Sequence, residues 1–206
     1  MPDSTFSWNE RAGRFRDASG RFVPEAKVRS GVDAVVDAAS QRASNLAKDL
    51  REGRINLEQF RDGMFQAIKD VHIASALSAY GGKQAMNESK WGFVGSQIKA
   101  QYMYARGMLN DIISGKQAMN GRLDQRAIMY MEAARTTYET IRLREGLKRG
   151  VTQVRNILHA KESCDQCKGL TGDGWMDADK MIPIGARQCL SRCACTLEMR
   201  ILRAAA

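Results

Sequence analysis

Five cysteines toward the C-terminal end of the chain are the residues whose types and spacing best suit a chemical role. They form a Cys-x-x-Cys pair, Cys164 and Cys167, and a later group made of Cys189, Cys193 and Cys195. Two cysteines separated by two residues can turn both thiolates toward one tetrahedral ion, and a second group about 20 residues later can complete the site. The spacing therefore predicts a structural zinc site.

Five thiols exceed the four ligands that structural zinc takes. We expect Cys164, Cys167, Cys189 and Cys193 to be the ligands, with Cys195 either replacing Cys189 or remaining free. Two alternatives stay open: a pair of disulfides in an oxidising environment, and cysteines that remain unbridged. Synthesis in a reducing cytoplasm favours zinc over disulfides at the folding step.

The segment that carries these cysteines differs in composition from the rest of the chain. The helical period stops after Gly150, Val151 to Leu158 alternates like a strand, and the remainder is rich in Gly and Cys. Few large apolar side chains are available for a core, and a structural zinc contributes on the order of 10 kcal/mol to folding. We therefore predict a small α+β zinc-knuckle domain over residues 151–206.

Residues 31–150 show four stretches of helical periodicity, which indicate a mainly α fold. The first begins at Val32, and the second follows Asn56, a residue type that favours helix N-caps. The third follows Asn87, and the fourth begins at about Leu123. Four long amphipathic helices predict a four-helix bundle or stacked helical hairpins.

Residues 1–30 contain Gly and Arg but no apolar period, and we interpret them as an extended N-terminal arm. The motif Gly-Arg-Phe occurs twice within them, ending at Phe15 and at Phe22. A disordered tail is one interpretation. The other is a segment that orders against a neighbouring subunit, with these two rings as anchors.

The formal net charge of +9 raises the question of nucleic-acid binding. The positive excess is spread along the chain, and only Arg142, Arg144, Lys148 and Arg149 form a cluster. Because cations also complement the C-terminal end of a helix, a solvated helix end and a phosphate contact both remain open for this cluster. The charge thus permits nonspecific phosphate contacts without establishing them.

The sequence offers little for catalysis. Its two histidines are His72, among the apolar residues of the second predicted helix, and His159, which precedes the cysteine pair. We expect His72 to be a packing histidine, and His159 is a minor candidate for a zinc ligand. A Cys-His or Ser-His-Asp site therefore has few candidates, and we predict no catalytic residues.

No stretch reaches the roughly 18 consecutive apolar residues of a membrane span. The first residues are polar where a signal peptide would be apolar. We therefore expect a protein that is made in the cytoplasm and has no membrane partner.

The cysteine segment contains three stretches that carry a resemblance: His159-Ala-Lys-Glu-Ser-Cys164-Asp-Gln-Cys167-Lys-Gly-Leu, Ile182-Pro-Ile and Cys193-Ala-Cys195-Thr-Leu. Together they resemble the C-terminal signature of tailed-phage head morphogenesis proteins, the minor head protein family. That family pairs a mostly helical region with a Cys-x-x-Cys, Gly-containing turns and a closing Cys-x-Cys. An opening segment, Arg16-Asp-Ala-Ser-Gly-Arg-Phe22, is also similar to the start of many phage structural proteins.

The resemblance implies a ligand set that differs in one member from the set favoured by spacing. By the resemblance, Cys164, Cys167, Cys193 and Cys195 occupy the signature positions. Many members of the family place His-Pro just before the closing Cys-x-Cys, whereas this chain has Cys189 in that approach. This departure leaves the identity of the fourth ligand open.

The function that the resemblance implies is structural. Such a protein enters the prohead in few or many copies, contacts capsid, portal or connector subunits, and becomes part of the virion. The charge permits nonspecific phosphate contacts with packaged DNA. The alternative is a zinc-dependent nucleic-acid-binding or regulatory module, for which the cysteine segment offers enough cations for phosphates but few for bases: Lys161, Lys168, Arg187 and Arg192.

Overall fold

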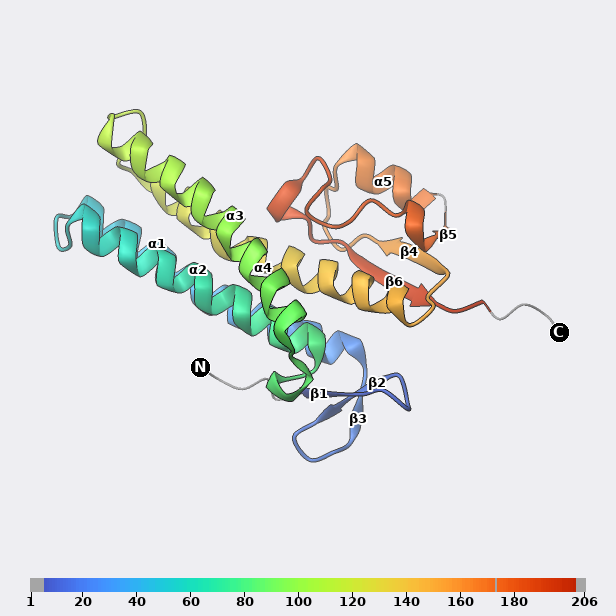
Figure 1. The fold of residues 1–206 in the computed structure, drawn as a ribbon. Coiled ribbons are helices and arrows are strands. Elements are labelled where there is room, and N and C mark those ends of the chain that lie inside the picture. Colours follow the sequence, from blue (N-terminus) through green and yellow to red (C-terminus); the bar gives the residue numbers. More distant parts are fainter. Residues whose placement is uncertain (1–5, 173, 203–206) are drawn as a thin grey trace.

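Four long helices form the main body of the computed structural model, which describes residues 6–172 and 174–202. Successive helices run in opposite directions, with the α1–α2 and α3–α4 connections at the same end (Figure 1). The predicted mainly helical fold is therefore confirmed. The bounds of the four helices are α1 (Glu25–Arg51), α2 (Leu57–Tyr80), α3 (Glu88–Ile113) and α4 (Gly121–Lys148).

Asparagine side chains cap three of these helices at their N-termini. The Asn56 side chain accepts a hydrogen bond from the Gln59 backbone N–H at 2.8 Å, and the Gln59 side chain accepts one from the Asn56 N–H at 2.9 Å. This reciprocal capping box satisfies amide groups that have no partner inside the helix. Asn87 and Asn120 accept single bonds from the first turns of α3 and α4. The predicted N-cap role of Asn56 is thus confirmed.

The main hydrophobic core lies between α1, α2 and α4, which pack against one another, while α3 packs chiefly against α2. Each predicted apolar stripe contributes buried side chains to this core. Examples are Val36 of α1, Ile68 of α2, Val94 of α3 and Ile141 of α4. The helical periodicity of the sequence therefore predicted the buried faces correctly.

The segment interpreted as an extended arm is instead a three-stranded antiparallel sheet. Its order is β1-β2-β3, and Phe15 in the middle strand is 2 % exposed and belongs to the main core. The prediction of an arm over residues 1–30 was therefore wrong for the described part, and residues 1–5 lie outside it. The strands are β1 (Phe6–Asn9), β2 (Arg14–Asp17) and β3 (Phe22–Val23).

The shortness of these strands explains the error. Trp8 lies opposite Phe15, which in turn lies opposite Val23, so one face of the sheet is apolar. Strands of two to four residues place only one or two side chains each on that face, too few to show an alternating pattern. Helix α1 also begins before Val32, because Val28 adds one more fully buried turn.

The C-terminal part forms a second small antiparallel sheet with one short helix, α5 (Asp165–Gly172). Strand β4 (Gln153–Ile157), which confirms the predicted strand, lies between β5 (Trp175–Asp177) and β6 (Thr196–Arg200). Its hydrophobic core includes Leu143 of α4. The C-terminal unit is therefore docked on the helical body through a shared core.

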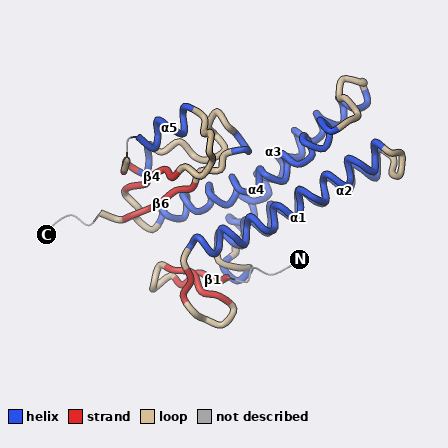
Figure 2. Tube along the Cα trace, turned by 180° about the vertical axis from the view of Figure 1, so that it is seen from behind, coloured by secondary structure: helices blue, strands red, loops and turns tan. Residues whose placement is uncertain are grey.

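The two sheets lie on opposite sides of the helices, near the end away from the α1–α2 and α3–α4 connections (Figures 1 and 2). Within the described residues, none of the helices is both long and apolar enough to cross a membrane.

Candidate metal centre

Three separate segments of the C-terminal unit bring the five cysteines together. Cys164 directly precedes α5, and Cys167 lies in the first turn of that helix. Cys189 and Cys193 flank a 3-10 turn, and Cys195 directly precedes β6. The cysteines are thus held at the ends of regular elements, whose backbones fix the positions of the sulfurs.

The sulfur atoms have the spacing expected of ligands around one ion. Cys167 Sγ lies 3.7 Å from Cys189 Sγ and 3.8 Å from Cys193 Sγ. With Zn–S distances of about 2.3 Å, the corners of a tetrahedral thiolate site lie about 3.8 Å apart. All five cysteines are free thiols in the structure. The buried cluster could therefore hold a metal ion.

Cys167 is the centre of the cluster. One group contains Cys164, Cys167 and Cys189, the other contains Cys167, Cys193 and Cys195, and within each group the sulfurs lie within 4.8 Å of one another. Burial raises the pKa of Cys189, and hydrogen bonds with Cys193, Cys164 and Cys167 raise it further. Burial likewise raises the pKa of Cys195 to about 12, with Cys193 and Cys167 adding to the shift. Without a cation, these two thiols therefore hold their protons.

Arg187 is buried against the cysteines and is 1 % exposed. Its Nη1 donates toward Cys167 Sγ at 3.7 Å and toward Cys193 Sγ at 4.0 Å. No carboxylate among the described residues forms an ion pair with it. Because a buried guanidinium keeps its charge, it requires a nearby negative group, and the sulfurs are the atoms in place to supply one.

Neutral groups complete the surroundings of this arginine. Its Nε donates to the Ile182 carbonyl at 3.0 Å, and its Nη1 donates to Asn156 Oδ1 at 2.8 Å. The Asn156 amide nitrogen in turn donates to the Cys167 carbonyl at 3.1 Å and to Thr171 Oγ1 at 2.8 Å. This network fixes α5, and with it Cys167, against β4.

Sequence reasoning missed the roles of Arg187 and Asn156. Arg187 was considered a phosphate contact, but the structure buries it, so that interpretation was wrong. The only signal in the sequence is its position two residues before Cys189. Nothing in the local pattern marks Asn156, which is fully buried in the middle of β4.

The two histidines lie outside the groups of close sulfurs. His72 is buried in α2, where its Nδ1 hydrogen-bonds to Thr137 Oγ1 at 2.8 Å, which confirms the packing role. His159 Nε2 hydrogen-bonds to Thr196 Oγ1 at 2.9 Å and belongs to neither potential metal group within the described residues.

Three of the four cations in the basic cluster at the end of α4 pair with carboxylates of the same chain. Arg142 donates two hydrogen bonds to Glu25, at 3.0 and 3.1 Å, and Lys148 lies 2.8 Å from Glu145. Arg149 pairs with Glu10 at 3.3 Å, and its guanidinium lies over the Trp8 ring. A phosphate at this cluster would therefore compete with these internal pairs, and the phosphate contact stays a prediction.

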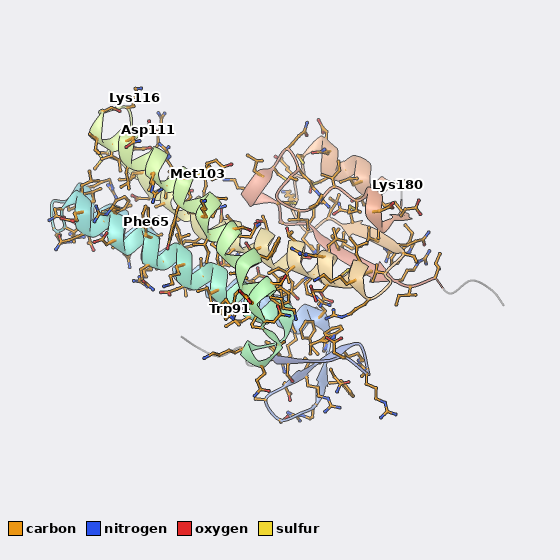
Figure 3. The ribbon with its side chains drawn as sticks, viewed as in Figure 1. Phe65, Trp91, Met103, Asp111, Lys116 and Lys180 are labelled. Atoms are coloured by element: carbon orange, nitrogen blue, oxygen red, sulfur yellow. The ribbon has the colours of Figure 1, made fainter. Side chains whose placement is uncertain are left out.

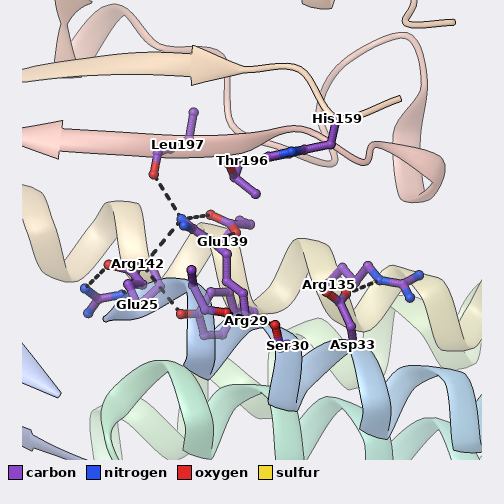
Figure 4. Close-up of polar contacts among 12 residues, drawn as sticks. Glu25, Arg29, Ser30, Asp33, Arg135, Glu139, Arg142, His159, Thr196 and Leu197 are labelled. Atoms are coloured by element: carbon purple, nitrogen blue, oxygen red, sulfur yellow. Dashed lines mark hydrogen bonds and ion pairs between the residues drawn. The ribbon is translucent and has the colours of Figure 1, made fainter. Parts of the chain in front are cut away.

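A cleft of about 970 Å³ lies where part of the cysteine unit faces α1 and α4. Arg29 and Glu139, which form an ion pair, line this cleft (Figure 4). Arg135 also lines the cleft and pairs with Asp33 and Asp37. These carboxylates are thus neutralised by arginines. Cys193 and Cys195 also contribute to the wall of the cleft.

Comparison with known proteins adds no family to these observations. No protein-family model matches the chain, and neither a curated protein nor a solved structure shows significant similarity to it. The function must therefore be argued from the cysteine cluster, the molecular surface and the local likeness of the cysteine segment.

Proposed function

We propose that the chain is a structural component of a tailed-phage head, in which a zinc-held C-terminal unit and a rigid four-helix bundle contact capsid, portal or connector subunits. The observation that carries the metal part of this proposal is the 3.7 and 3.8 Å spacing of the sulfurs around Cys167. The virion part is supported by the resemblance of the cysteine segment to the minor head protein signature.

Zinc suits the cluster better than other common ions. Thiolate ligands in a tetrahedral arrangement favour zinc or iron–sulfur centres, whereas calcium and magnesium take oxygen ligands. A zinc ion with four thiolates carries a net charge of about −2, and the buried Arg187 supplies a compensating positive charge. The metal would hold α5, the 3-10 turn and β6 together.

The contacts favour Cys164, Cys167, Cys189 and Cys193 as the ligand set. Cys167 Sγ lies 3.7 Å from Cys189 Sγ and 3.8 Å from Cys193 Sγ. Cys164 forms one close group with Cys167 and Cys189. In this assignment Cys195 is the spare thiol. The set that includes Cys195 in place of Cys189 is the competing assignment.

Metal analysis under reducing conditions tests this centre. We expect one zinc per chain, and thiol titration before and after chelation should show four additional reactive thiols after the metal is removed. Cys195→Ser should retain the zinc, and Cys167→Ser should lose it. A purified protein without zinc, or one whose stability does not change on chelation, would contradict the metal assignment.

Exposed apolar side chains along α3 support a role in protein–protein contacts. Trp91 and Met103 lie along this helix, and Tyr104 and Ile113 are also exposed (Figure 3). Exposed large apolar side chains that gather on one element are typical of interaction surfaces. In the proposed role, α3 packs against a neighbouring subunit of the head.

Copurification tests the virion assignment. We expect the protein to remain with assembled heads through density-gradient separation, and Met103→Glu together with Tyr104→Glu to reduce its incorporation. Lys99→Glu, a change at an exposed polar position of α3, is the matched control. Absence of the protein from purified heads at all stages of assembly would overturn the proposal, even if zinc is bound.

A further inference from the structure

The outward face of the N-terminal sheet carries arginines at regular positions. Because Trp8 and Phe15 face the interior, strand alternation puts Arg14 and Arg16 on the opposite face of β2. Phe22, the partner of Arg16 in β3, lies on the same face and is 41 % exposed. This face therefore combines two cations with one exposed ring.

The Phe22 ring holds the two guanidinium groups in place. The Cζ atoms of Arg14 and Arg16 lie 5.0 and 4.6 Å from the ring centroid. Such cation–π contacts orient the guanidinium planes and leave N–H groups free to donate. Arg16 Nε is buried and has no hydrogen-bond partner among the described residues. Both guanidinium groups thus lie against the Phe22 ring.

The carboxylates of this sheet are already engaged elsewhere. Glu10 accepts a hydrogen bond from Trp8 Nε1 at 3.0 Å and pairs with Arg149. Asp17 accepts bonds from the backbone of the β2–β3 turn and lies 3.7 Å from Arg21. In the described part of the chain, Arg11, Arg14 and Arg16 consequently have no ion pair with any carboxylate.

We propose that this face binds the phosphate backbone of nucleic acid without reading its sequence. Residues two apart on a strand lie about 6.7 Å apart, comparable to the spacing of successive phosphates along a nucleic-acid strand. Arginine forks donate pairs of hydrogen bonds to phosphate oxygens, and the neighbouring Arg11 adds charge. This surface is separate from the cysteine cluster, so the inference stands or fails apart from the metal centre and the virion role.

Fluorescence anisotropy with the full-length protein tests this inference on a short DNA duplex and on one of its single strands. We expect affinity for the duplex to fall steeply between about 50 and about 200 mM salt. Arg14→Gln combined with Arg16→Gln should make the slope of log K against log salt less steep by about 1.8, because each lost phosphate contact removes about 0.9. For the single strand, the slope of log K against log salt should also become less steep, by about 1.4.

Two controls separate this face from general charge and from loss of folding. Arg42→Gln combined with Arg61→Gln removes the same charge from exposed positions that pair with carboxylates, and should leave the slope nearly unchanged. Phe22→Leu keeps both cations but removes the ring, so it should weaken binding with little change in slope. Arg14→Gln alone changes an exposed position and keeps the fold. It should change the salt slope by half as much as the double variant does.

Three outcomes would overturn the inference. One is an absence of DNA binding by the wild-type protein at low salt. Another is an equal change of the salt slope in the Arg42/Arg61 control, which would indicate that net charge alone determines DNA binding. A third is that the Arg14/Arg16 variant loses binding to anionic phospholipid vesicles but not to DNA. Strong preference for one duplex sequence would instead favour a regulatory DNA-binding protein and would also contradict sequence-independent binding.

Discussion

Arg29 of α1 and the buried Glu139 of α4 form a partly buried ion pair with two hydrogen bonds, Nε to Oε1 at 2.7 Å and Nη2 to Oε2 at 3.2 Å. The same Nη2 donates to the Leu197 carbonyl of β6 at 2.9 Å (Figure 4). One guanidinium therefore connects two helices of the main body with the C-terminal sheet. Burial raises the pKa of Glu139 despite the opposing charge of Arg29, which shows how strongly the site disfavours an unpaired carboxylate.

Removal of Arg29 is expected to be strongly destabilising. Arg29→Met would leave Glu139 buried without its main partner, and breaking a buried pair in this way costs about 3–5 kcal/mol. Arg135→Met is the matched control, because Arg135 pairs with the exposed Asp33 and Asp37, and such pairs contribute about 1 kcal/mol or less. Urea unfolding measures the free energy of unfolding of both variants. Equal losses in the two variants would contradict the role of the Arg29–Glu139 pair.

Arg187 is expected to tune the zinc affinity of the proposed metal centre. Arg187→Met keeps much of the buried apolar volume but removes the charge and the N–H groups that face Cys167 and Cys193. Loss of such an outer-shell partner typically lowers metal affinity about 10–100-fold, and we expect a loss of about that size for Arg187→Met. Arg187→Lys keeps the positive charge, so it should lose less affinity.

Competition with a chromogenic zinc chelator measures this effect. Arg192→Met is the control, because Arg192 lies on the turn between Cys189 and Cys193 but is exposed. If both methionine variants bind zinc with wild-type affinity, Arg187 only fills space.

The sequence predicted the parts of the molecule that repeat over many residues. The stripe through Val32, Val36 and Ala43 extends over several turns of α1, so its period is unambiguous. The grouping of the cysteines in space was also predictable, because two cysteines in a Cys-x-x-Cys motif can point their sulfurs toward the same ion. The N-terminal sheet was not, since its apolar face depends on single residues of three strands. The burial of Arg187 was equally hidden, because it arises only when β4 and α5 meet.

His72 is expected to make stability depend on pH. Burial lowers its pKa from 6.5 to about 4. The folded pKa lies below the unfolded one, so the unfolded state binds an extra proton between these values. Stability is thus fully present above about pH 6.5 and falls as the pH decreases, by up to about 1.4 kcal/mol per pH unit from this residue.

The variant His72→Asn does not titrate in this range and should show a smaller pH slope than the wild-type protein. Unfolding is measured from pH 7 down to about 4.5 under identical metal conditions, so that proton uptake by the cysteines contributes equally to both proteins. A slope that His72→Asn leaves unchanged would show that other groups dominate the acid sensitivity.

Gly81 is expected to be required for docking of the N-terminal sheet. It ends α2 with φ 86°, and a Cβ there would lie 2.3 Å from the Trp8 backbone nitrogen. Gly53, which follows α1, has φ 69° but no atom within 4 Å of such a Cβ, so Gly53→Ala isolates the conformational penalty of about 1–2 kcal/mol. Gly81→Ala should lower the free energy of unfolding by about 1–3 kcal/mol more than Gly53→Ala does, because the backbone of Trp8 cannot rotate away as a side chain can.

Hydrogen exchange distinguishes local undocking of the sheet from a general loss of stability. In Gly81→Ala the amides of β1 and β2 should exchange faster than those of α4, because Trp8 must move away from the end of α2. Gly53→Ala should leave this difference as in the wild-type protein. Equal protection of β1 in both variants would show that the close approach of Trp8 to Gly81 does not hold the sheet. In that case, the contacts of Arg142 and Arg149 with the Trp8 ring would be the interactions that keep it in place.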